Sequence, residues 1–373
     1  MRSFAKDKIL PYARDWDRAG AFPRDLLKEM GKLGFLGVPV PEEYGGAGLD
    51  YIAEAIVFEE VGYADSSVRT TLSVQMSLVE LTILKYAPEE LKRAYLPKLC
   101  SGEWIGCFGL TEPDAGSDAS NVKTTAVRRG NDWVINGQKV WISRIQHSDF
   151  MILLARTTPL DQVKKKSEGM SIFIVDIKEA MKTGLSVRPI LNMVNHETNE
   201  LFFDNLEIPA ENLIGEEGHG FKYILTGLNA ERILIAAECI GDGYWFVDKV
   251  SAYSKERVVF GRPIGQNQGV QFPIAESYIE VEAANLMRFE ACRLYDAGEP
   301  CGAQANMSKY LAAKASWEAA NACIQFHGGF GFACEYDVER KFRETRLYQV
   351  APISTNLILS FVAEHVLGLP RSF

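Results

Sequence analysis

The most informative stretch of this chain runs from Cys107 to Ser143. It begins Cys107-Phe108-Gly109-Leu110-Thr111-Glu112-Pro113-Asp114-Ala115-Gly116-Ser117-Asp118 and ends Asn136-Gly137-Gln138-Lys139-Val140-Trp141-Ile142-Ser143. The first part is typical of a turn that offers hydroxyl and backbone N–H groups to an anionic or polar ligand. The second part is typical of a strand that presents a flat indole. Together they predict a ligand site in a β-rich segment.

Composition bounds the class of protein. The chain has 373 residues and is 47% hydrophobic, which is enough for two or three domains. Its net charge is -9, and the only basic run, at 164–166, is expected to be a solvated loop. We therefore expect no nucleic-acid binding.

Cysteine usage and hydropathy bear on the compartment. The seven cysteines are odd in number and form no Cys-x-x-Cys pair, which favours reduced thiols. No apolar run reaches the ~18 residues that a membrane span requires. The N-terminus has no signal-peptide pattern and begins inside an amphipathic helix, which leaves room for a few residues or a transit peptide upstream. These features predict a cytoplasmic protein in a bacterium, or a mitochondrial-matrix protein in a eukaryote.

The hydrophobic period changes twice along the chain. Residues 1–104 have helical periodicity, interrupted by Gly and Pro at 34–46. Residues 105–215 contain short runs rich in β-branched and aromatic residues, with a hairpin-type turn at Gly130-Asn131. Residues 216–373 return to long helical patterns, which predict an antiparallel bundle of helices over 219–255, 267–297, 302–328 and 354–366.

The Thr-Glu-Pro-x-Ala-Gly-Ser-Asp turn and the Trp-Ile-Ser strand resemble the flavin-binding core of the acyl-CoA dehydrogenases. Three further motifs extend the resemblance over nearly the whole chain. They are Arg257-Val258-Val259-Phe260-Gly261-Arg262-Pro263-Ile264 with Gln268 and Phe272, then Gln325-Phe326-His327-Gly328-Gly329-Phe330-Gly331, and finally Ser354-Thr355-Asn356. Taken singly each is weak, since Trp141 alone is typical of a core and Arg257 alone of a surface ion pair.

The resemblance implies an α+β, mostly α fold with three domains. These are an N-terminal α-helical domain (1–104), a small middle β domain (105–215) and a C-terminal antiparallel four-helix bundle (216–373). It also implies bound FAD. The cofactor residues it implies are Leu110, Thr111, Gly116, Ser117, Trp141, Ser143, Arg257, Phe260, Gln268, Gln325, Gly328, Gly329, Ser354 and Asn356.

Within that set the resemblance implies individual roles. Thr111 would bind the pyrimidine edge of the flavin, Trp141 would stack near the ring, and Ser143 would contact the region of N5. Arg257 would neutralise pyrophosphate, and Ser117 would lie at the phosphate or pantetheine boundary. The chain has no Gly-x-Gly-x-x-Gly after a strand, so a nicotinamide site is not supported.

The catalytic base is displaced from its common place in the family. Pro352 stands where most members have glutamate, and residues 345–363 contain no carboxylate. A subset that includes the isovaleryl-CoA and long-chain types carries its base in Leu-x-x-Glu-Arg, which matches Leu228-Asn229-Ala230-Glu231-Arg232. Glu231 is therefore the predicted base, on an apolar helix face that should raise its pKa. The alternative is a glutamate that reaches solvent or pairs with an arginine.

Two departures from the family pattern carry expectations of their own. Pro352 has no N–H to polarise a thioester carbonyl, so either the N–H of Ile353 replaces it or the site has been repurposed. Arg144-Ile145 follow Ser143 where the family has Asn-Gly, which predicts an altered surface beside the flavin.

We therefore expect an acyl-CoA dehydrogenase that forms the trans-2-enoyl-CoA and passes electrons to electron-transferring flavoprotein. Acyl-CoA contacts are expected from Ser117, Leu228, Arg232, Ala351 and Pro352, no metal is expected, and the assembly would be a homotetramer. The alternatives are an oxidase or a non-oxidative CoA-thioester lyase on the same fold, and a nucleic-acid-binding relative, which the acidic charge disfavours.

Overall fold

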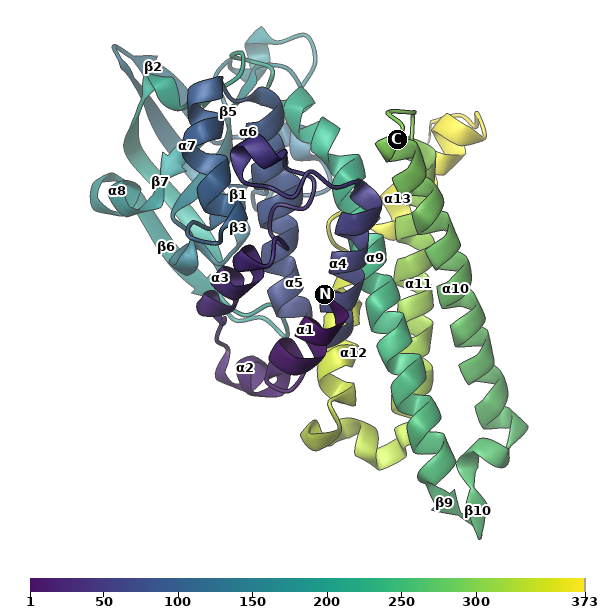
Figure 1. Cartoon of the computed structure of the whole chain (residues 1–373). Coiled ribbons are helices and arrows are strands. Elements are labelled where there is room, and N and C mark those ends of the chain that lie inside the picture. Colours follow the sequence, from purple (N-terminus) through teal and green to yellow (C-terminus); the bar gives the residue numbers. More distant parts are fainter. Residues whose placement is uncertain (372–373) are drawn as a thin grey trace. The chain divides into compact units, whose positions relative to one another are not determined.

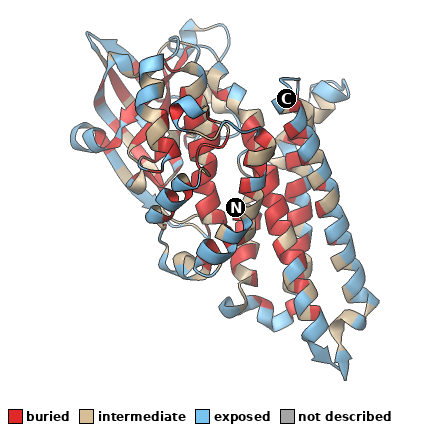
Figure 2. Ribbon diagram, in the orientation of Figure 1, coloured by how far each residue is buried: buried red, intermediate tan, exposed pale blue. Residues whose placement is uncertain are grey.

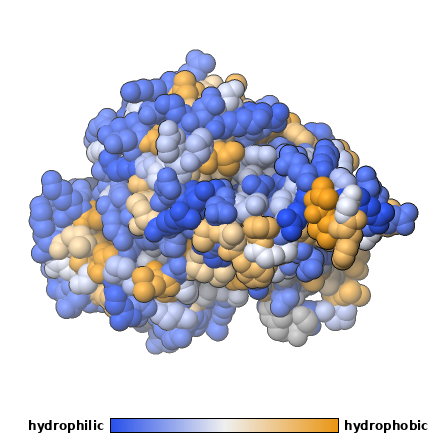
Figure 3. All heavy atoms as spheres, turned by 90° about the horizontal axis from the view of Figure 1, so that it is seen from below, coloured by the Kyte–Doolittle hydropathy of each residue, from blue (hydrophilic) through white to orange (hydrophobic). Residues whose placement is uncertain are grey.

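The computed structural model describes residues 1–371, which group into two compact bodies (Figure 1). We call Met1–Ala19, Asp50–Arg69 and Asn229–Phe373 the helical body, and Gly20–Leu49 and Thr70–Leu228 the sheet body. Within the described part of the chain, no helix combines the length and the apolarity needed to cross a membrane. The face in Figure 3 is mainly hydrophilic, with separate apolar patches.

The N-terminal third of the chain is helical, as predicted. Its helices are α1 (Arg2–Phe4), α2 (Ala13–Ala19), α3 (Arg24–Lys32), α4 (Tyr51–Ala64), α5 (Ser66–Ser73), α6 (Leu81–Tyr86) and α7 (Glu89–Cys100). Asp50 caps α4 by accepting a hydrogen bond from the N–H of Ala53.

The sheet body contains one mixed sheet in the order β6-β7-β3-β2-β4-β5-β8, and β1 pairs with β4. The strands are β1 (Gly106–Gly109), β2 (Thr125–Arg129), β3 (Asp132–Ser143), β4 (Phe150–Arg156), β5 (Met170–Asp176), β6 (Leu185–Ile190), β7 (Thr198–Pro209) and β8 (Leu213–Ile214), with helix α8 (Ile177–Thr183) after β5. Arg129 pairs with Asp132, so Gly130-Asn131 forms the predicted hairpin turn. The periodicity did not reveal β1, β6, β8 or α8, which are short or lack a clean alternation.

Strands β4 and β5 hold the sheet body together. All of β4 is buried, and its alternate residues enter different cores because successive side chains point to opposite faces. Ile152 and Leu154 pack in one hydrophobic cluster, and Met151 and Leu153 in another.

The C-terminal part of the chain contains the predicted long helices. They are α9 (Gly220–Glu256), α10 (Gln268–Asp296) and α11 (Gly302–His327), and a short hairpin of β9 (Val258–Val259) and β10 (Arg262–Pro263) joins α9 to α10. The fourth predicted helix is shorter than expected, since 354–366 splits into α13 (Thr355–Phe361) and a π-helical turn (Val362–Val366). Helix α12 (Val338–Arg346), which the periodicity did not reveal, packs against α11. Figure 2 shows buried residues along the packed faces of these helices.

Helices α4 and α9 approach each other until their backbones are almost in contact. A Cβ atom added to Gly62 would lie 2.9 Å from the carbonyl oxygen of Glu238. A Cβ added to Gly241 would overlap the carbonyl oxygen of Glu59. Only glycine fits at both positions, because these obstacles are backbone atoms that cannot rotate away.

We expect Gly241→Ala to lower the free energy of unfolding by about 1–3 kcal/mol, the usual cost of forcing extra atoms into a packed interior. Gly269→Ala is the matched control, since a Cβ there meets nothing within 4 Å. It should leave stability unchanged or raise it by up to about 1 kcal/mol. Urea denaturation followed by circular dichroism measures both, and equal stability of the two variants would contradict the close contact.

Candidate active site

The Thr-Glu-Pro turn is fixed to strand β3 by a buried ion pair. Glu112 accepts hydrogen bonds from the N–H groups of Lys123 (2.7 Å) and Thr124 (2.9 Å) and pairs with Lys139 Nζ at 2.9 Å. Lys139 also donates to the carbonyl oxygen of Leu110 at 2.9 Å. The N–H of Val140 donates to the carbonyl oxygen of Thr111. The motif's glutamate and the strand's lysine therefore position Leu110 and Thr111.

The pKa values of Lys139 and Glu112 are both lowered, but for different reasons. Burial lowers the pKa of Lys139 to about 8, against the opposing effect of the Glu112 carboxylate. Burial alone would raise the pKa of Glu112, but Lys139 and the hydrogen bonds from Thr124 and Lys123 outweigh it and lower that pKa.

Trp141 projects from strand β3 at a bulge. The pairing of β3 with β7 shifts register between Lys139 and Ile142, and Trp141 has φ 64°. Its side chain is 58% exposed, so Trp141 is not a core residue and its indole is free to stack on a planar ligand. Nearby in the same body, Gly116 and Ser117 are exposed on the turn, and Ser143 is half-buried.

Arg144 and Ile145 do not form the altered surface that their sequence predicts. Both side chains are buried, at 3% and 2% exposure. Arg144 has φ 62°, a left-handed conformation that the asparagine common in the family adopts readily. Its guanidinium pairs with Glu197 at 3.4 Å and lies 4.3 Å from the centre of the Phe22 ring. The prediction was wrong because these partners are distant in sequence.

In the helical body, two of the family-like motifs lie together. Arg257 follows helix α9, and its guanidinium lies 5.5 Å from the centre of the ring of Phe330 in the glycine-rich loop. Arg257, Gln268, Gln325, Gly328 and Gly329 are all exposed. Arg257 thus makes a cation–π contact, and it forms no ion pair within residues 1–371, which the structure describes.

Phe260 lies at the tip of the β9–β10 hairpin. It is fully exposed and has φ 52°. Its ring therefore packs on nothing within the described residues of this chain, and any ring system it covers must come from outside.

The segment around Pro352 is anchored by a buried lysine. Lys309 Nζ donates to the carbonyl oxygens of Tyr348 (2.6 Å) and Ile353 (2.7 Å), and burial lowers its pKa to about 8. The Ala351–Pro352 peptide is cis, with Ala351 half-buried and Pro352 exposed. Ser354 caps helix α13 through the N–H of Leu357, and Asn356 is exposed.

Glu231 is buried on helix α9, with 4% of its surface exposed. It therefore does not reach solvent, which was one of the two alternatives to a catalytic role. Its neighbour Arg232 is half-buried and donates to the side-chain oxygen of Asn229 at 2.8 Å. Leu228 packs against the apolar cluster of the sheet body.

A second buried carboxyl, that of Glu54 on helix α4, interacts electrostatically with Glu231. Glu54 is 1% exposed, and neither of its carboxyl oxygens has a hydrogen-bond partner among the described residues. Burial, followed by the charges of Glu231 and Asp296, raises the pKa of Glu54 from 4.5 to about 8. The sequence signal for it was a lone acidic residue in the apolar run Tyr51-Ile52-Ala53-Glu54-Ala55-Ile56-Val57.

Glu238, one heptad after Glu231, is held in an ion pair. Its carboxylate lies 2.7 Å from Arg69, and both side chains are buried. Arg69 also donates to the hydroxyl of Tyr348 at 2.9 Å. The carboxylate of Glu238 is therefore paired with Arg69, and Glu231 stays the predicted base.

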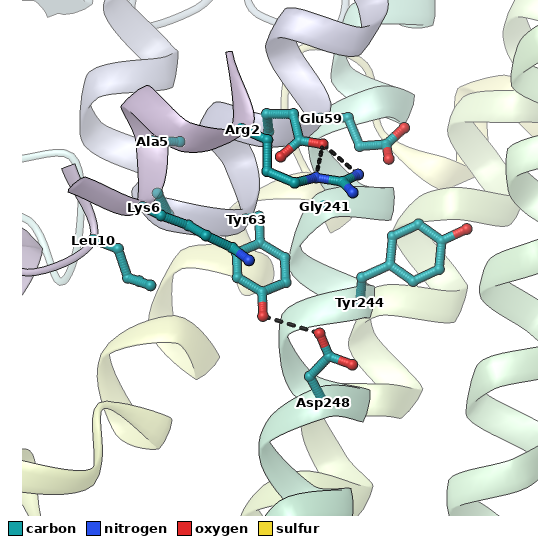
Figure 4. A pocket seen from close by; sticks show the side chains of 11 residues that line it. Arg2, Ala5, Lys6, Leu10, Glu59, Tyr63, Gly241, Tyr244 and Asp248 are labelled. Atoms are coloured by element: carbon teal, nitrogen blue, oxygen red, sulfur yellow. Dashed lines mark hydrogen bonds and ion pairs between the residues drawn. The ribbon is translucent and has the colours of Figure 1, made fainter. Parts of the chain in front are cut away.

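A cavity of about 360 Å³ lies among α1, α4 and α9 (Figure 4). The side chains around it interact with one another, since Arg2 pairs with Glu60 and the hydroxyl of Tyr63 donates to Asp248 at 2.9 Å. None of the predicted site residues lines it.

We expect Glu54→Gln to make stability less dependent on pH. The native pKa of Glu54 lies above the unfolded value, so its contribution to stability is fully present below about pH 4.5 and is lost as pH rises through about 8. Replacing it should raise the unfolding free energy relative to wild type by a few kcal/mol at pH 9, and by progressively less toward pH 5.

Urea denaturation between pH 5 and 9 measures this difference. Glu276→Gln, at an exposed position on α10, is the matched control and should follow wild type at every pH. A Glu54→Gln curve parallel to wild type would show that Glu54 does not titrate in this range.

Comparison with known proteins extends these observations. The family models of the acyl-CoA dehydrogenase N-terminal, middle and C-terminal domains match residues 1–103, 107–206 and 218–367. An acyl-CoA dehydrogenase of Bacillus subtilis is 37% identical, with 99% of this chain and 96% of the relative covered. The human mitochondrial short-chain specific acyl-CoA dehydrogenase is 35% identical, with 100% of this chain and 89% of the relative covered.

Solved structures that resemble this chain point to the same family. A glutaryl-CoA dehydrogenase in complex with glutaryl-CoA superposes with a TM-score of 0.93 at 36% identity, covering 100% of this chain and 94% of the other. A structure described as the electron transferring flavoprotein of Acidaminococcus fermentans superposes with a TM-score of 0.93 at 34% identity, covering 98% of this chain and 95% of the other. A Mycobacterium smegmatis glutaryl-CoA dehydrogenase in complex with FADH2 superposes with a TM-score of 0.92 at 29% identity, covering 100% of this chain and 93% of the other.

The chain belongs to the acyl-CoA dehydrogenase family of flavoprotein oxidoreductases, which act in fatty acid metabolism. The predicted fold class is confirmed, with N-terminal helical, middle β and C-terminal helical domains. The boundaries at 104 and 215 and the roles of individual site residues stay predictions.

Proposed function

We propose that the protein is an FAD-dependent dehydrogenase of a fatty or branched-chain acyl-CoA, with Glu231 as its base. The observation that carries the proposal is the burial of Glu231 on α9, combined with a proline at position 352. In the proposed reaction the α-proton of the thioester passes to a carboxylate oxygen of Glu231 and the product is the trans-2-enoyl-CoA. A bound flavin supplies the acceptor for the hydride that leaves the β-carbon.

The residues of this chain suit a flavin dinucleotide. An exposed indole at Trp141 and the hydroxyl groups of Thr111 and Ser143 can meet a planar ring with polar edges. The exposed guanidinium of Arg257 can meet pyrophosphate. The remaining proposed contacts come from Leu110, Gly116, Ser117, Phe260, Gln268, Gln325, Gly328, Gly329, Ser354 and Asn356.

For acyl-CoA we propose contacts from Ser117, Leu228, Arg232, Ala351 and Pro352. Pro352 has no N–H, so we propose that the N–H of Ile353 polarises the thioester carbonyl. Lys309 supports this role by holding the carbonyl oxygen of Ile353 at 2.7 Å, which restrains the peptide that follows Ile353 and so helps to fix that residue.

We further propose electron-transferring flavoprotein as the acceptor and a homotetramer as the assembly. Membership of the family supports electron-transferring flavoprotein as the acceptor, and two exposed apolar features support the homotetramer. One is the hairpin tip at Phe260, and the other is the exposed series Phe272, Ile279, Leu286 and Phe289 on α10. Such a surface is typical of an interface with other chains.

We expect Glu231→Gln to bind flavin normally but to slow its anaerobic reduction by acyl-CoA at least ~10²–10⁴-fold, the contribution of a general base. The measurement is stopped-flow bleaching of the flavin with isovaleryl, isobutyryl, butyryl, octanoyl and palmitoyl thioesters. Glu211→Gln, at an exposed position after β7, is the matched control and should react like wild type.

The outcomes separate the rival functions. Rapid bleaching that survives in Glu231→Gln would leave the reaction intact and reject Glu231. Bound flavin that no thioester bleaches would favour a non-oxidative lyase, and bleached flavin that reoxidises rapidly in air would favour an oxidase.

We expect Phe260→Ser to weaken assembly, because it removes a fully exposed ring from the hairpin. Sedimentation velocity over a dilution series should give a smaller particle than wild type at low concentration. Leu160→Ser, another exposed apolar position, should not change the particle size. An unchanged tetramer in Phe260→Ser would remove the hairpin from the proposed interface.

A further inference from the structure

A hydrogen-bonded chain in the sheet body leads from a buried arginine to the hydroxyl of Ser143. Arg144 lies against the carboxylate of Glu197 at 3.4 Å and against the side-chain oxygen of Asn195 at 3.5 Å. The other face of the same carboxylate meets His147 Nε2 at 2.9 Å. Asn195 Nδ2 then reaches Ser143 Oγ at 3.0 Å.

The chemistry of arginine sets the orientation of the Asn195 amide. A guanidinium can only donate hydrogen bonds, so the side chain of Asn195 must turn its oxygen toward Arg144. The amide nitrogen then faces Ser143 and also Thr198 Oγ1 at 3.4 Å. The backbone supports this placement, because Asn195 has φ 54° and Thr198 Oγ1 donates to the Asn195 carbonyl oxygen at 2.7 Å.

The orientation of Asn195 in turn sets the role of Ser143. A hydroxyl has one hydrogen and two lone pairs, and here Oγ accepts from Asn195. The hydrogen of Ser143 is therefore directed away from Asn195 and is available to donate to another group.

We propose that Asn195, oriented by Arg144, is a positioning residue that makes the Ser143 hydroxyl a hydrogen-bond donor to the isoalloxazine edge of the flavin. The inference rests on the proposed flavin role of Ser143. It gives Arg144 a purpose that its sequence position alone did not reveal. A donor at that edge stabilises the extra electron density of the reduced ring, so it raises the midpoint potential and strengthens FAD binding.

The test is Asn195→Asp, which keeps the shape of the side chain and reverses its hydrogen bonding. A carboxylate next to Arg144 accepts only, so it turns the Ser143 hydrogen toward itself. We expect FAD affinity to fall about twofold to tenfold, the range for loss of one hydrogen bond, and the midpoint potential to fall. Fluorescence titration of the apoprotein and anaerobic redox titration measure these quantities without turnover.

A double-mutant cycle separates the hydroxyl from the added charge. In the Ser143→Ala background, Asn195→Asp should cause no further change in affinity or potential, because the group it acts through is gone. A full effect of Asn195→Asp in that background would mean that charge alone is responsible and would overturn the proposal. Asn131→Asp, in the exposed turn between β2 and β3, adds the same charge at a distance and should behave like wild type.

Asn195→Gly guards against a variant that does not fold. Glycine accepts the φ of 54° and removes the amide, which leaves the hydroxyl free to rotate. Asn195→Gly should lower FAD affinity and the midpoint potential less than Asn195→Asp does. An affinity and a potential equal to those of wild type in Asn195→Gly would also overturn the proposal. Absence of FAD binding in the wild-type protein would instead reject the proposed function itself.

Discussion

The close approach of helices α4 and α9 is the constraint on which the helical body depends. Gly62 and Gly241 remove the side chains that would hold the two backbones apart. The interior that results excludes water, so each ionisable group inside it must find a partner or give up its charge. Arg69 forms an ion pair with Glu238, and Lys341 forms one with Asp242. Removing one member of such a pair typically costs about 3–5 kcal/mol, because the other charge is left buried and uncompensated.

Glu54 and Glu231 are the informative cases in that interior. Glu54 has no hydrogen-bond partner among the described residues, and its raised pKa means that it is largely protonated at neutral pH. Two carboxylates that interact electrostatically in a water-free interior repel each other when both are ionised, so ionisation of both at once is unfavourable. A protonated Glu54 therefore places no second negative charge beside Glu231, the carboxylate that we propose as the base. Packing between two helices thus becomes a condition for the proposed chemistry.

The sheet body uses the same physics for a different purpose. A buried Lys139–Glu112 pair closes the Thr-Glu-Pro turn against β3, and the buried Arg144, paired with the half-buried Glu197, closes the end of that strand. Between these two anchors, the bulge turns Trp141 outward. The charged residues of these pairs contact each other and the neighbouring backbone. They hold the strand so that its neutral groups are available to a ligand.

The sequence by itself determined the fold class, the long helices, the hairpin at Gly130-Asn131 and the family, because hydrophobic period and ordered motifs are local signals. It also selected Glu231, since the Leu-x-x-Glu-Arg motif lies within one helix. Only the tertiary structure revealed the surroundings of Glu54, Lys309 and Asn195, and it reversed the prediction for Arg144. Each of these side chains is defined by partners that are far away in sequence, and burial and pairing at such distances follow from packing, which no local pattern records.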